Sequence, residues 1–457
     1  MDGPSKVPGK ERINTMNDLL EKYLYGPEEE KASVLAGLPE KHPDPLTLVR
    51  SCIAARWDGR GPGKVFEDHF EMPHLRRRYP DELLSFCAPD GYSPDTAHGL
   101  LVLLHGGGDG TPRTAARAWV EESDGPGAYH LGRELARKPY VTVAPSNLLL
   151  PTHKRWSNPL SDDYILGVIE ETSFRYNIDP NRVVILGQSM GGFGAYHVVQ
   201  TIGDRFATVG CHAGAWYYGF WEGLHGVHFY NMQGANDAVP GVRPRFTEVA
   251  FARFAAAILS GYHLPHTYRE HQGGHSFTDP LAREVLLKFL NAICDVRRTP
   301  FPERVVTASR KGAFRLFDSP HHFWVTVGKT HFGTFELDHL EPTESQPSYC
   351  TTNFQHRRIR CQGGTVDAVN SGDNTIEVKT HNVYGLTLWF HPQMVDFNRP
   401  VRIVINGEVK HEDLLKPNLH TVLQSYDRRR DGGMLFSARL DFDLKINDWE
   451  RQRKSAD

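Results

Sequence analysis

Short apolar runs alternate with stretches of helical spacing through the middle of the chain. Strands that alternate with helices in this way are typical of a parallel sheet with right-handed crossovers. We therefore predict an α/β domain over residues 79–296, with a mostly parallel, doubly wound sheet covered by helices. The apolar runs lie at 83–89, 99–104, 141–145, 183–186, 207–213, 227–233 and 266–270.

The first part of the chain, residues 1–78, has a different pattern. Leu46, Val49, Ile53 and Trp57 recur at helical spacing, which predicts one face of an amphipathic helix. A glycine-rich loop follows at 59–63. We expect this part to be a helical N-terminal extension that packs on the α/β domain.

After residue 297 the hydrophobic period shortens to that of β-strands. Five short β-branched and aromatic runs follow, and Asn406-Gly407 directly after the fifth, at 401–405, is a strong hairpin signal. This pattern predicts a β-sandwich-like, all-β accessory domain over 297–447. We expect residues 448–457 to form a disordered tail.

Composition and charge limit the classes of partner that the chain is expected to bind. The formal net charge is -3, so the chain has no polybasic surface that would favour nucleic acid. The arginine clusters 76–78 and 428–430 have acidic neighbours, and we expect both in solvated loops. No run approaches the roughly 18 apolar residues of a membrane span, so we expect no membrane partner.

The N-terminus and the cysteines bear on location. Residues 1–6 contain no apolar segment of the kind found in secretion signals. If Met1 is the native start, a cytoplasmic location follows. The six cysteines are scattered without a CxxC pair, which favours reduced thiols. Pairing of Cys350 with Cys361 is the alternative for an exported protein.

The sequence Gly187-Gln188-Ser189-Met190-Gly191 follows an apolar run and precedes a helical stretch. A strand, a G-x-S-x-G turn and a helix together form a nucleophile elbow, which exposes a serine hydroxyl at the top of a sheet. The alternative is a glycine-rich strand-to-helix turn without chemistry. The positions of other reactive side chains must decide between the two.

A serine hydroxyl needs a nearby base and a group that orients the base. Asp237 and then His275 follow Ser189 along the chain, each just after a predicted strand. The order nucleophile, acid, histidine is the one expected of this kind of sheet. The alternatives are a turn-capping aspartate, a loop histidine without a catalytic role, and His271 in place of His275.

A glycine-rich segment, His105-Gly106-Gly107-Gly108, follows another predicted strand. Backbone N–H groups in such a turn can approach a developing oxyanion closely. We predict that the donors are the N–H of Met190 and one from Gly106 or Gly107. A phosphate-binding loop is less consistent, because neither Gly-Lys-Ser/Thr nor GxGxxG is present.

Aromatic residues gather between two of the predicted strands, in the segment 216–221. Trp216, Tyr217 and Trp221, with Gln188 of the elbow, are candidates to line a substrate pocket. Packing in the core or in a lid explains the aromatic residues equally well.

Residues of about 80–295 resemble the α/β-hydrolase superfamily, and especially the polyhydroxybutyrate depolymerase, feruloyl esterase and dienelactone-hydrolase-like esterases. The resemblance rests on Pro89-Asp90-Gly91-Tyr92, His105-Gly106-Gly107, Gly187-Gln188-Ser189-Met190-Gly191-Gly192, Asp237 and Gly274-His275-Ser276-Phe277.

This resemblance implies hydrolysis of a small-molecule or polymer ester through an acyl-enzyme, with neither a metal nor an organic cofactor. The alternatives are a serine peptidase of the prolyl-oligopeptidase kind and a non-catalytic binding protein on a hydrolase fold. The sequence leaves the acyl group, the alcohol and any homo-oligomer open.

Overall fold

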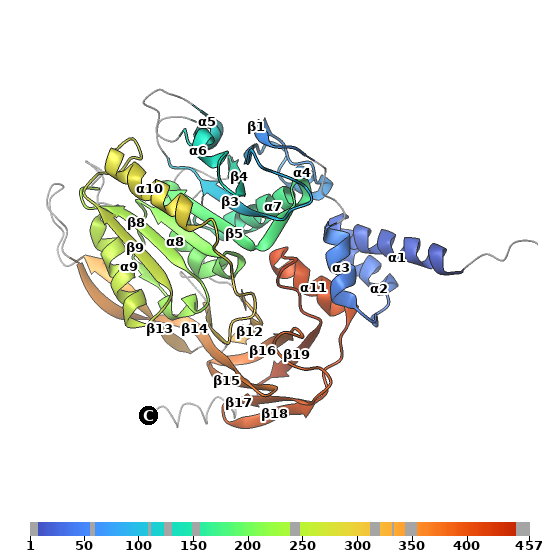
Figure 1. Ribbon diagram of the computed structural model, residues 1–457. Coiled ribbons are helices and arrows are strands. Elements are labelled where there is room, and N and C mark those ends of the chain that lie inside the picture. Colours follow the sequence, from blue (N-terminus) through green and yellow to red (C-terminus); the bar gives the residue numbers. More distant parts are fainter. Residues whose placement is uncertain are drawn as a thin grey trace, which may run out of the picture.

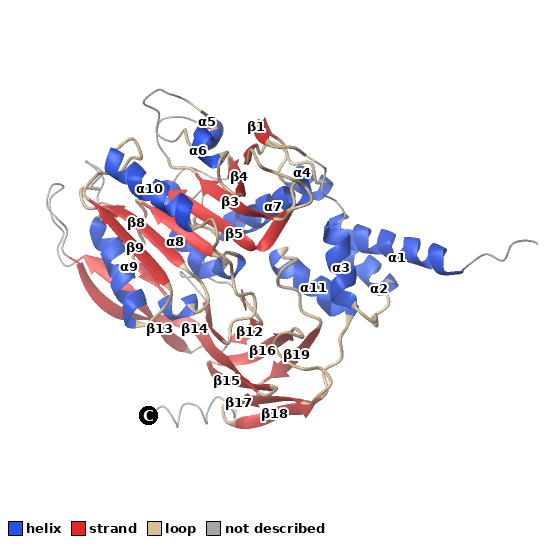
Figure 2. Cartoon of the chain, viewed as in Figure 1, coloured by secondary structure: helices blue, strands red, loops and turns tan. Residues whose placement is uncertain are grey.

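The computed structural model of the chain describes residues 8–54, 60–107, 111–122, 130–148, 156–237, 247–310, 320–330, 333–342 and 354–444. A sheet flanked by helices forms one body, a strand-rich body lies beside it, and a group of helices lies to one side (Figures 1 and 2). Among the described helices, none combines the length and the apolar character needed to cross a membrane.

The first body is built on an eight-stranded sheet in the order β1-β2-β4-β3-β5-β6-β8-β9. All neighbours from β4 to β9 are parallel, whereas β2 is antiparallel to both β1 and β4. This arrangement confirms the mostly parallel sheet. Its strands are β1 (Gly63–Asp68), β2 (Leu84–Ala88), β3 (His98–Leu104), β4 (Tyr140–Pro145), β5 (Ile178–Gln188), β6 (Thr208–His212), β8 (Phe229–Gly234) and β9 (His266–His271).

Helices cover both faces of this sheet, as the doubly wound prediction requires. Alternate residues of β3 enter two separate apolar cores: Leu100 and Val102 pack with one, and Leu101 and Leu103 with the other. The helices of the first core include α4 (Pro73–Arg78), α7 (Pro159–Arg175), α8 (Met190–Thr201) and α9 (Val249–Gly261), and those of the second are α5 (Pro112–Val120), α6 (Gly132–Leu135) and α10 (Pro280–Ala292).

The N-terminal helices pack on a different partner from the one expected. Leu20, Val49 and Cys52 share an apolar cluster with Leu419 and Leu423 of a C-terminal helix. The extension therefore docks on the far end of the chain, and the sheet of the first body already begins at β1, before residue 79. The helices are α1 (Pro8–Tyr25), η1 (Glu28–Glu30), α2 (Lys31–Gly37), α3 (Pro45–Ala54) and α11 (Leu419–Arg429).

Two further sheets form the C-terminal body. One runs β18-β17-β15-β14-β13-β7 with β10 paired to β14, and the other runs β11-β12-β16-β19. Val366 and Ile376 of the first share a core with Val325 and Leu388 of the second, as in a sandwich. The strands are β7 (Tyr218–Gly219), β10 (Arg304–Arg310), β11 (His321–His322), β12 (Val325–Thr330), β13 (Thr334–Pro342), β14 (Phe354–Gly372), β15 (Thr375–His381), β16 (Val383–Phe390), β17 (Val401–Ile405), β18 (Glu408–Asp413) and β19 (Ala438–Asp443).

This body differs from the expected all-β domain in two ways. It includes α11, and β7 comes from the first body, between β6 and β8. β7 pairs with β13 through Tyr218 opposite His339 and Gly219 opposite Asp338. The segment between β6 and β8 is therefore fixed to the sandwich by backbone hydrogen bonds.

Buried ion pairs join the two bodies at the end of α11. Asp204, in the short helix η3 (Gly203–Arg205), accepts hydrogen bonds from Arg429 Nε and from the backbone N–H of Phe323, both at 2.9 Å. Arg298 Nη1 lies 2.6 Å from Asp431 Oδ2. The expectation of a solvated loop is wrong for residues 428–430, because Arg429 is only 5% exposed and ends a helix.

Candidate active site

The elbow predicted from the sequence is present at the end of β5. Ser189 lies between β5 and α8 with φ 56° and ψ -115°, a conformation that is strained for a residue with a Cβ atom. Its backbone N–H donates to His212 O at 3.0 Å, and its carbonyl oxygen accepts from Phe193 N at 3.0 Å. The strain is therefore held by the neighbouring strand β6 and by the first turn of α8.

The glycines of the elbow are required by close backbone contacts. A Cβ atom on Gly187 would lie 1.9 Å from Gly191 O, and one on Gly191 would lie 2.1 Å from Leu104 O. Both distances are far below van der Waals contact and involve backbone atoms, which cannot rotate away. The strand and the helix can cross this closely only where side chains are absent.

The three residues expected to form a triad lie within hydrogen-bond distance of one another. His275 Nε2 is 2.8 Å from Ser189 Oγ, and His275 Nδ1 is 2.8 Å from Asp237 Oδ1. Because ionised Asp237 can only accept, Nδ1 carries the proton, and Nε2 is left to accept from the serine hydroxyl. Asp237 follows β8 and His275 follows β9, so both stand at the carboxyl edge of the sheet beside the elbow.

Asp237 is buried and held by two neutral donors. Thr247 Oγ1 donates to Oδ1 at 2.9 Å, and Gln233 Nε2 donates to Oδ2 at 3.0 Å. The side chain of Asp237 is 0% exposed, whereas that of His275 is 31% exposed. The carboxylate is thus fixed inside the protein while the imidazole faces the solvent side, where a substrate would arrive.

The loop that carries His275 is fixed at four points. Gly274 N donates to Asp279 Oδ2 at 2.9 Å, and Gln188 Nε2 donates to His275 O at 3.1 Å. Asn236 Nδ2 donates to Gln272 O at 2.7 Å. Gly273 N donates to Nδ1 of His271 at 3.2 Å. These contacts set the position of the imidazole relative to the elbow.

His271, the alternative base, lies in a buried histidine pair, whereas the imidazole within hydrogen-bond distance of Ser189 Oγ is that of His275. Its Nε2 is 3.2 Å from Nε2 of His212, and the two rings stack with centroids 5.5 Å apart. Burial lowers the pKa of both imidazoles, that of His212 well below its usual value. Both rings are therefore neutral near pH 7, and His271 acts on the loop rather than on the serine.

The predicted oxyanion donors flank the elbow. Met190 is the first residue of α8, where a backbone N–H has no acceptor within the helix. Gly106 O lies 2.7 Å from Nδ1 of His105, and His105 O accepts from Trp156 Nε1 at 3.1 Å. Since the C=O and N–H of a trans peptide point in opposite directions, the N–H groups of Gly106 and Gly107 point away from these two rings.

The four candidate pocket residues separate into different roles. Trp221 is fully buried, with its ring centroid 6.0 Å from that of Tyr196, so it packs the core instead of facing a substrate. Gln188 is 4% exposed and its amide holds the carbonyl of His275. Only Trp216 and Tyr217 are half-buried at the rim between the two bodies.

Tyr217 is the more informative of these two. Its ring packs edge-on against Phe251 of α9, with centroids 4.9 Å apart, and its backbone carbonyl accepts from Leu340 N of β13 at 2.6 Å. Among the described residues its buried hydroxyl has no hydrogen-bond partner. Burial raises its pKa to about 12, so the hydroxyl stays neutral and able to donate.

Sequence reasoning missed the residues that support the triad. Gln233, Thr247, Asp279 and His212 each bind a group of the site, yet none forms a motif with it. The signal for Gln233 is its place on the strand that leads to Asp237. Asp279 also caps α10 by accepting from Leu281 N at 2.9 Å, and a capping signature before Pro280 is readable in the sequence.

The fold brings together a serine hydroxyl, an imidazole and a carboxylate at this site. Within the described ranges, no group of three or more His, Cys, Asp or Glu side chains is placed to hold a metal ion. No disulfide joins two of the described cysteines.

Comparisons with known proteins agree in class. Residues 165–239, which include the elbow and Asp237, match the family model described as "Putative esterase". This match confirms the esterase resemblance at the level of class, for that segment. No curated protein matches the chain in sequence.

Solved structures of esterases and related hydrolases are similar to about half of the chain. A thermostable esterase is 19% identical with a TM-score of 0.36, over 48% of this chain and 60% of its own. A ferulic acid esterase from Anaeromyces mucronatus is 16% identical with a TM-score of 0.35, over 52% of this chain and 91% of its own. S-formylglutathione hydrolase from Staphylococcus aureus is 15% identical with a TM-score of 0.36, over 51% of this chain and 99% of its own. The α/β-hydrolase assignment rests on the sheet order, the elbow and the ordered loops described above.

Proposed function

We propose that the chain is a serine carboxylic-ester hydrolase that works through an acyl-enzyme. The observation that carries the proposal is the continuous hydrogen-bonded line from Ser189 Oγ through His275 to Asp237, with 2.8 Å at each step. A strained serine, a half-exposed imidazole and a buried carboxylate are the parts that nucleophilic acyl transfer requires.

In this reaction Ser189 Oγ attacks the ester carbonyl while His275 Nε2 takes the hydroxyl proton. Asp237 keeps the proton of the neutral imidazole on Nδ1 and stabilises the imidazolium that forms. His275 then protonates the departing alcohol, which leaves the acyl group on Ser189. Water attacks the acyl-enzyme by the same route, and the acid leaves.

The negative charge on the carbonyl oxygen needs donors that are already in place. The N–H of Met190, which has no acceptor within its helix, and an N–H of Gly106 or Gly107, which points away from the Trp156 and His105 rings, are the proposed pair. Each such donor contributes roughly 3–4 kcal/mol of transition-state stabilisation in enzymes where it has been removed.

Trp216 and Tyr217 are the proposed contacts of the substrate. Both are half-buried on the segment between β6 and β7. The hydroxyl of Tyr217, which has no hydrogen-bond partner among the described residues, can donate to an acyl or alkoxy oxygen. The backbone of this segment is held by β13 at Leu340. The sandwich body would thus fix the shape of the substrate pocket.

The test is turnover of p-nitrophenyl acetate and p-nitrophenyl butyrate by purified protein. Ser189→Ala should reduce kcat by several orders of magnitude and leave the thermal unfolding midpoint close to that of the wild type. Ser51→Ala is the matched control, since Ser51 is exposed on α3 and, among the described residues, its hydroxyl donates to Leu48 O alone. Unchanged turnover in Ser189→Ala would overturn the proposal.

Assays on the same purified protein distinguish the proposed esterase from two other functions. A serine peptidase would cleave p-nitroanilide peptides faster than matched esters. A non-catalytic binding protein would turn over neither substrate, and a fluorophosphonate probe would not label Ser189.

A further inference from the structure

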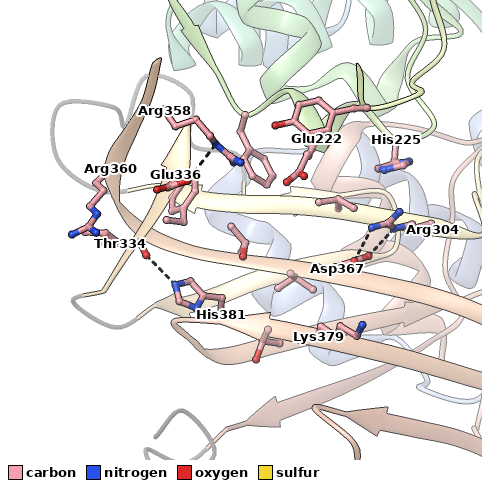
Figure 3. Close-up of a pocket in the computed structure, with 17 residues that line it drawn as sticks. Glu222, His225, Arg304, Thr334, Glu336, Arg358, Arg360, Asp367, Lys379 and His381 are labelled. Carbon is pink, nitrogen blue, oxygen red and sulfur yellow. Dashed lines mark hydrogen bonds and ion pairs between the residues drawn. The ribbon is translucent and has the colours of Figure 1, made fainter. Parts of the chain in front are cut away.

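A cavity of about 900 Å³ lies between the two bodies, on the strand face of the sandwich. Strands β10, β13, β14 and β15 form its floor, and the segment around Glu222 and His225 covers it from the first body (Figure 3). No residue of the triad lines it. Its size is within the range of ligand-binding clefts in proteins.

The floor is polar and partly fixed by ion pairs. Arg304 binds Asp367 with two hydrogen bonds, at 2.9 and 2.8 Å, and Arg358 Nε lies 3.3 Å from Glu336 Oε2 (Figure 3). Paired in this way, these side chains present fixed donors and acceptors to the cavity. An apolar ligand would displace water from these side chains without replacing the hydrogen bonds of that water, so its binding would be unfavourable.

Within the described part of the chain, two cations on this floor lie across the strand ladder from carboxylates, Arg360 from Glu336 and Lys379 from Asp367, without an ion pair to them. Arg360 of β14 and Lys379 of β15 are both exposed and make no hydrogen bond or ion pair there. Glu222 is likewise without a bonded partner among the described residues, and it supplies an acceptor from the other wall. The cavity therefore has spare binding capacity, mainly for anionic groups.

The balance of charge limits the class of ligand. Four cationic residues (Arg304, Arg358, Arg360 and Lys379) and three acidic ones (Glu222, Glu336 and Asp367) line the cavity, a difference of one positive charge. The phosphodiester backbone of DNA offers these three carboxylates no hydrogen-bond donors, so it would leave them desolvated. A ligand with many hydroxyl groups and a few carboxylates could exchange hydrogen bonds with the ion-paired side chains and place its carboxylates against Arg360 and Lys379.

We propose that this cavity binds an oligosaccharide that carries carboxylate groups. Arg360 and Lys379 bind the carboxylates, while the Arg304–Asp367 pair and Glu222 exchange hydrogen bonds with sugar hydroxyls. Guanidinium and ammonium groups bind carboxylates through charge-assisted hydrogen bonds, which are stronger than those between neutral groups. The proposal is independent of the ester chemistry, because the ligand need not reach Ser189.

Calorimetric titration of the wild-type protein with tetragalacturonate tests the proposal, with the neutral sugar xylotetraose as the matched ligand. Tetragalacturonate should bind saturably with one site per chain, and xylotetraose about tenfold more weakly or not at all. Added salt should weaken the binding of tetragalacturonate, because exposed charges are screened.

Variants locate the site. Lys379→Gln and Arg360→Gln should each weaken binding of tetragalacturonate by about tenfold. Arg357→Gln is the control, since Arg357 precedes Arg358 on β14, pairs with Glu341 at 3.0 Å and is not among the lining residues. Lys379→Arg keeps the charge and should retain most of the affinity.

Three results would overturn the proposal. These are no saturable binding of tetragalacturonate at millimolar concentration, equal binding of the two sugars, and unchanged binding in the double variant of Lys379 and Arg360. Far-ultraviolet circular dichroism and the unfolding midpoint of each variant ensure that a loss of binding is not a loss of fold.

Discussion

At the residue scale, the proposed mechanism depends on the position of one carboxylate. Asp237 receives hydrogen bonds from Thr247, Gln233 and His275. Because the two neutral donors fix its oxygens, the acceptor for the imidazole N–H is in place before a substrate arrives. Such preorganisation removes a cost that would otherwise be met in the transition state.

Thr247→Val tests this role. The hydroxyl that donates to Asp237 is lost, and the carboxylate becomes less well fixed. We expect kcat for p-nitrophenyl butyrate to fall about tenfold, which corresponds to about 1.4 kcal/mol, with a smaller change in KM.

The control for Thr247→Val is Thr172→Val in α7. Thr172 is also buried, and its hydroxyl donates to Val168 O at 2.7 Å, away from the site. This variant should lose comparable stability and keep its kcat. A loss of kcat in both variants would show that Thr247 acts only through stability.

At the element scale, the elbow depends on a crossing of β3, β5 and α8 that leaves no room for side chains. Gly191→Ala would place a Cβ atom 2.1 Å from Leu104 O. Backbone must move to relieve this contact, so we expect the free energy of unfolding in urea to fall by about 3 kcal/mol. Activity should fall too, since Ser189 would be displaced.

Gly261→Ala provides the comparison. Gly261 ends α9, and a Cβ atom there would have no heavy atom within 4 Å. Its stability should be unchanged or raised by about 0.5 kcal/mol, because alanine restricts the unfolded chain. Equal stabilities for the two variants would contradict the crossing geometry.

The sequence was sufficient for elements that are specified locally. The apolar run 183–186 and the glycines around Ser189 predicted the elbow. Asp237 and His275 were predicted as its acid and histidine because each comes just after a predicted strand. Each depends on a few neighbouring residues, and the order of strands in such a sheet brings them together.

Elements that depend on distant partners were missed. The two residues of β7 become a strand only because β13, more than a hundred residues later, pairs with them. The burial of Trp221 likewise follows from Tyr196 and Phe229, not from its own segment. The hydrophobic alternation and the composition of a segment do not show which distant residues it will contact. For α11 a local signal existed, since Leu419, Val422, Leu423 and Tyr426 recur at helical spacing after a capping asparagine.

At the scale of the whole molecule, α11 joins three parts of the chain. Buried charges link its end to the first body and the sandwich, and an apolar cluster links it to the N-terminal helices. Burial alone would raise the pKa of Asp204. The charges of Arg429 and His322 and the hydrogen bonds from Arg429 and Phe323 N–H outweigh it, and they lower that pKa from 3.8 to about 2. The folded state therefore favours the ionised carboxylate.

This shift predicts how stability depends on pH. A lowered folded-state pKa contributes stability above about pH 4, and the contribution is lost as the pH falls through about 2. Its size is about 2 kcal/mol. The difference in free energy of unfolding between the wild type and Asp204→Asn should thus shrink by about 2 kcal/mol from about pH 5 to about pH 2.

Asp373→Asn is the reference for that experiment. Asp373 is 86% exposed and pairs with Arg399 on the surface. The substitution should change the free energy of unfolding by less than about 0.5 kcal/mol at either pH, since exposed ion pairs contribute little to stability. A difference for Asp204→Asn that does not vary with pH would contradict the buried network.

The central claim is that Ser189 carries the acyl group. Mass spectrometry of peptides from protein quenched within the first turnovers of p-nitrophenyl butyrate tests it most directly. We predict a butyryl group on Ser189 in the wild type and no butyryl group in Ser189→Ala. A butyryl group on another residue, or continued hydrolysis by Ser189→Ala, would contradict the account.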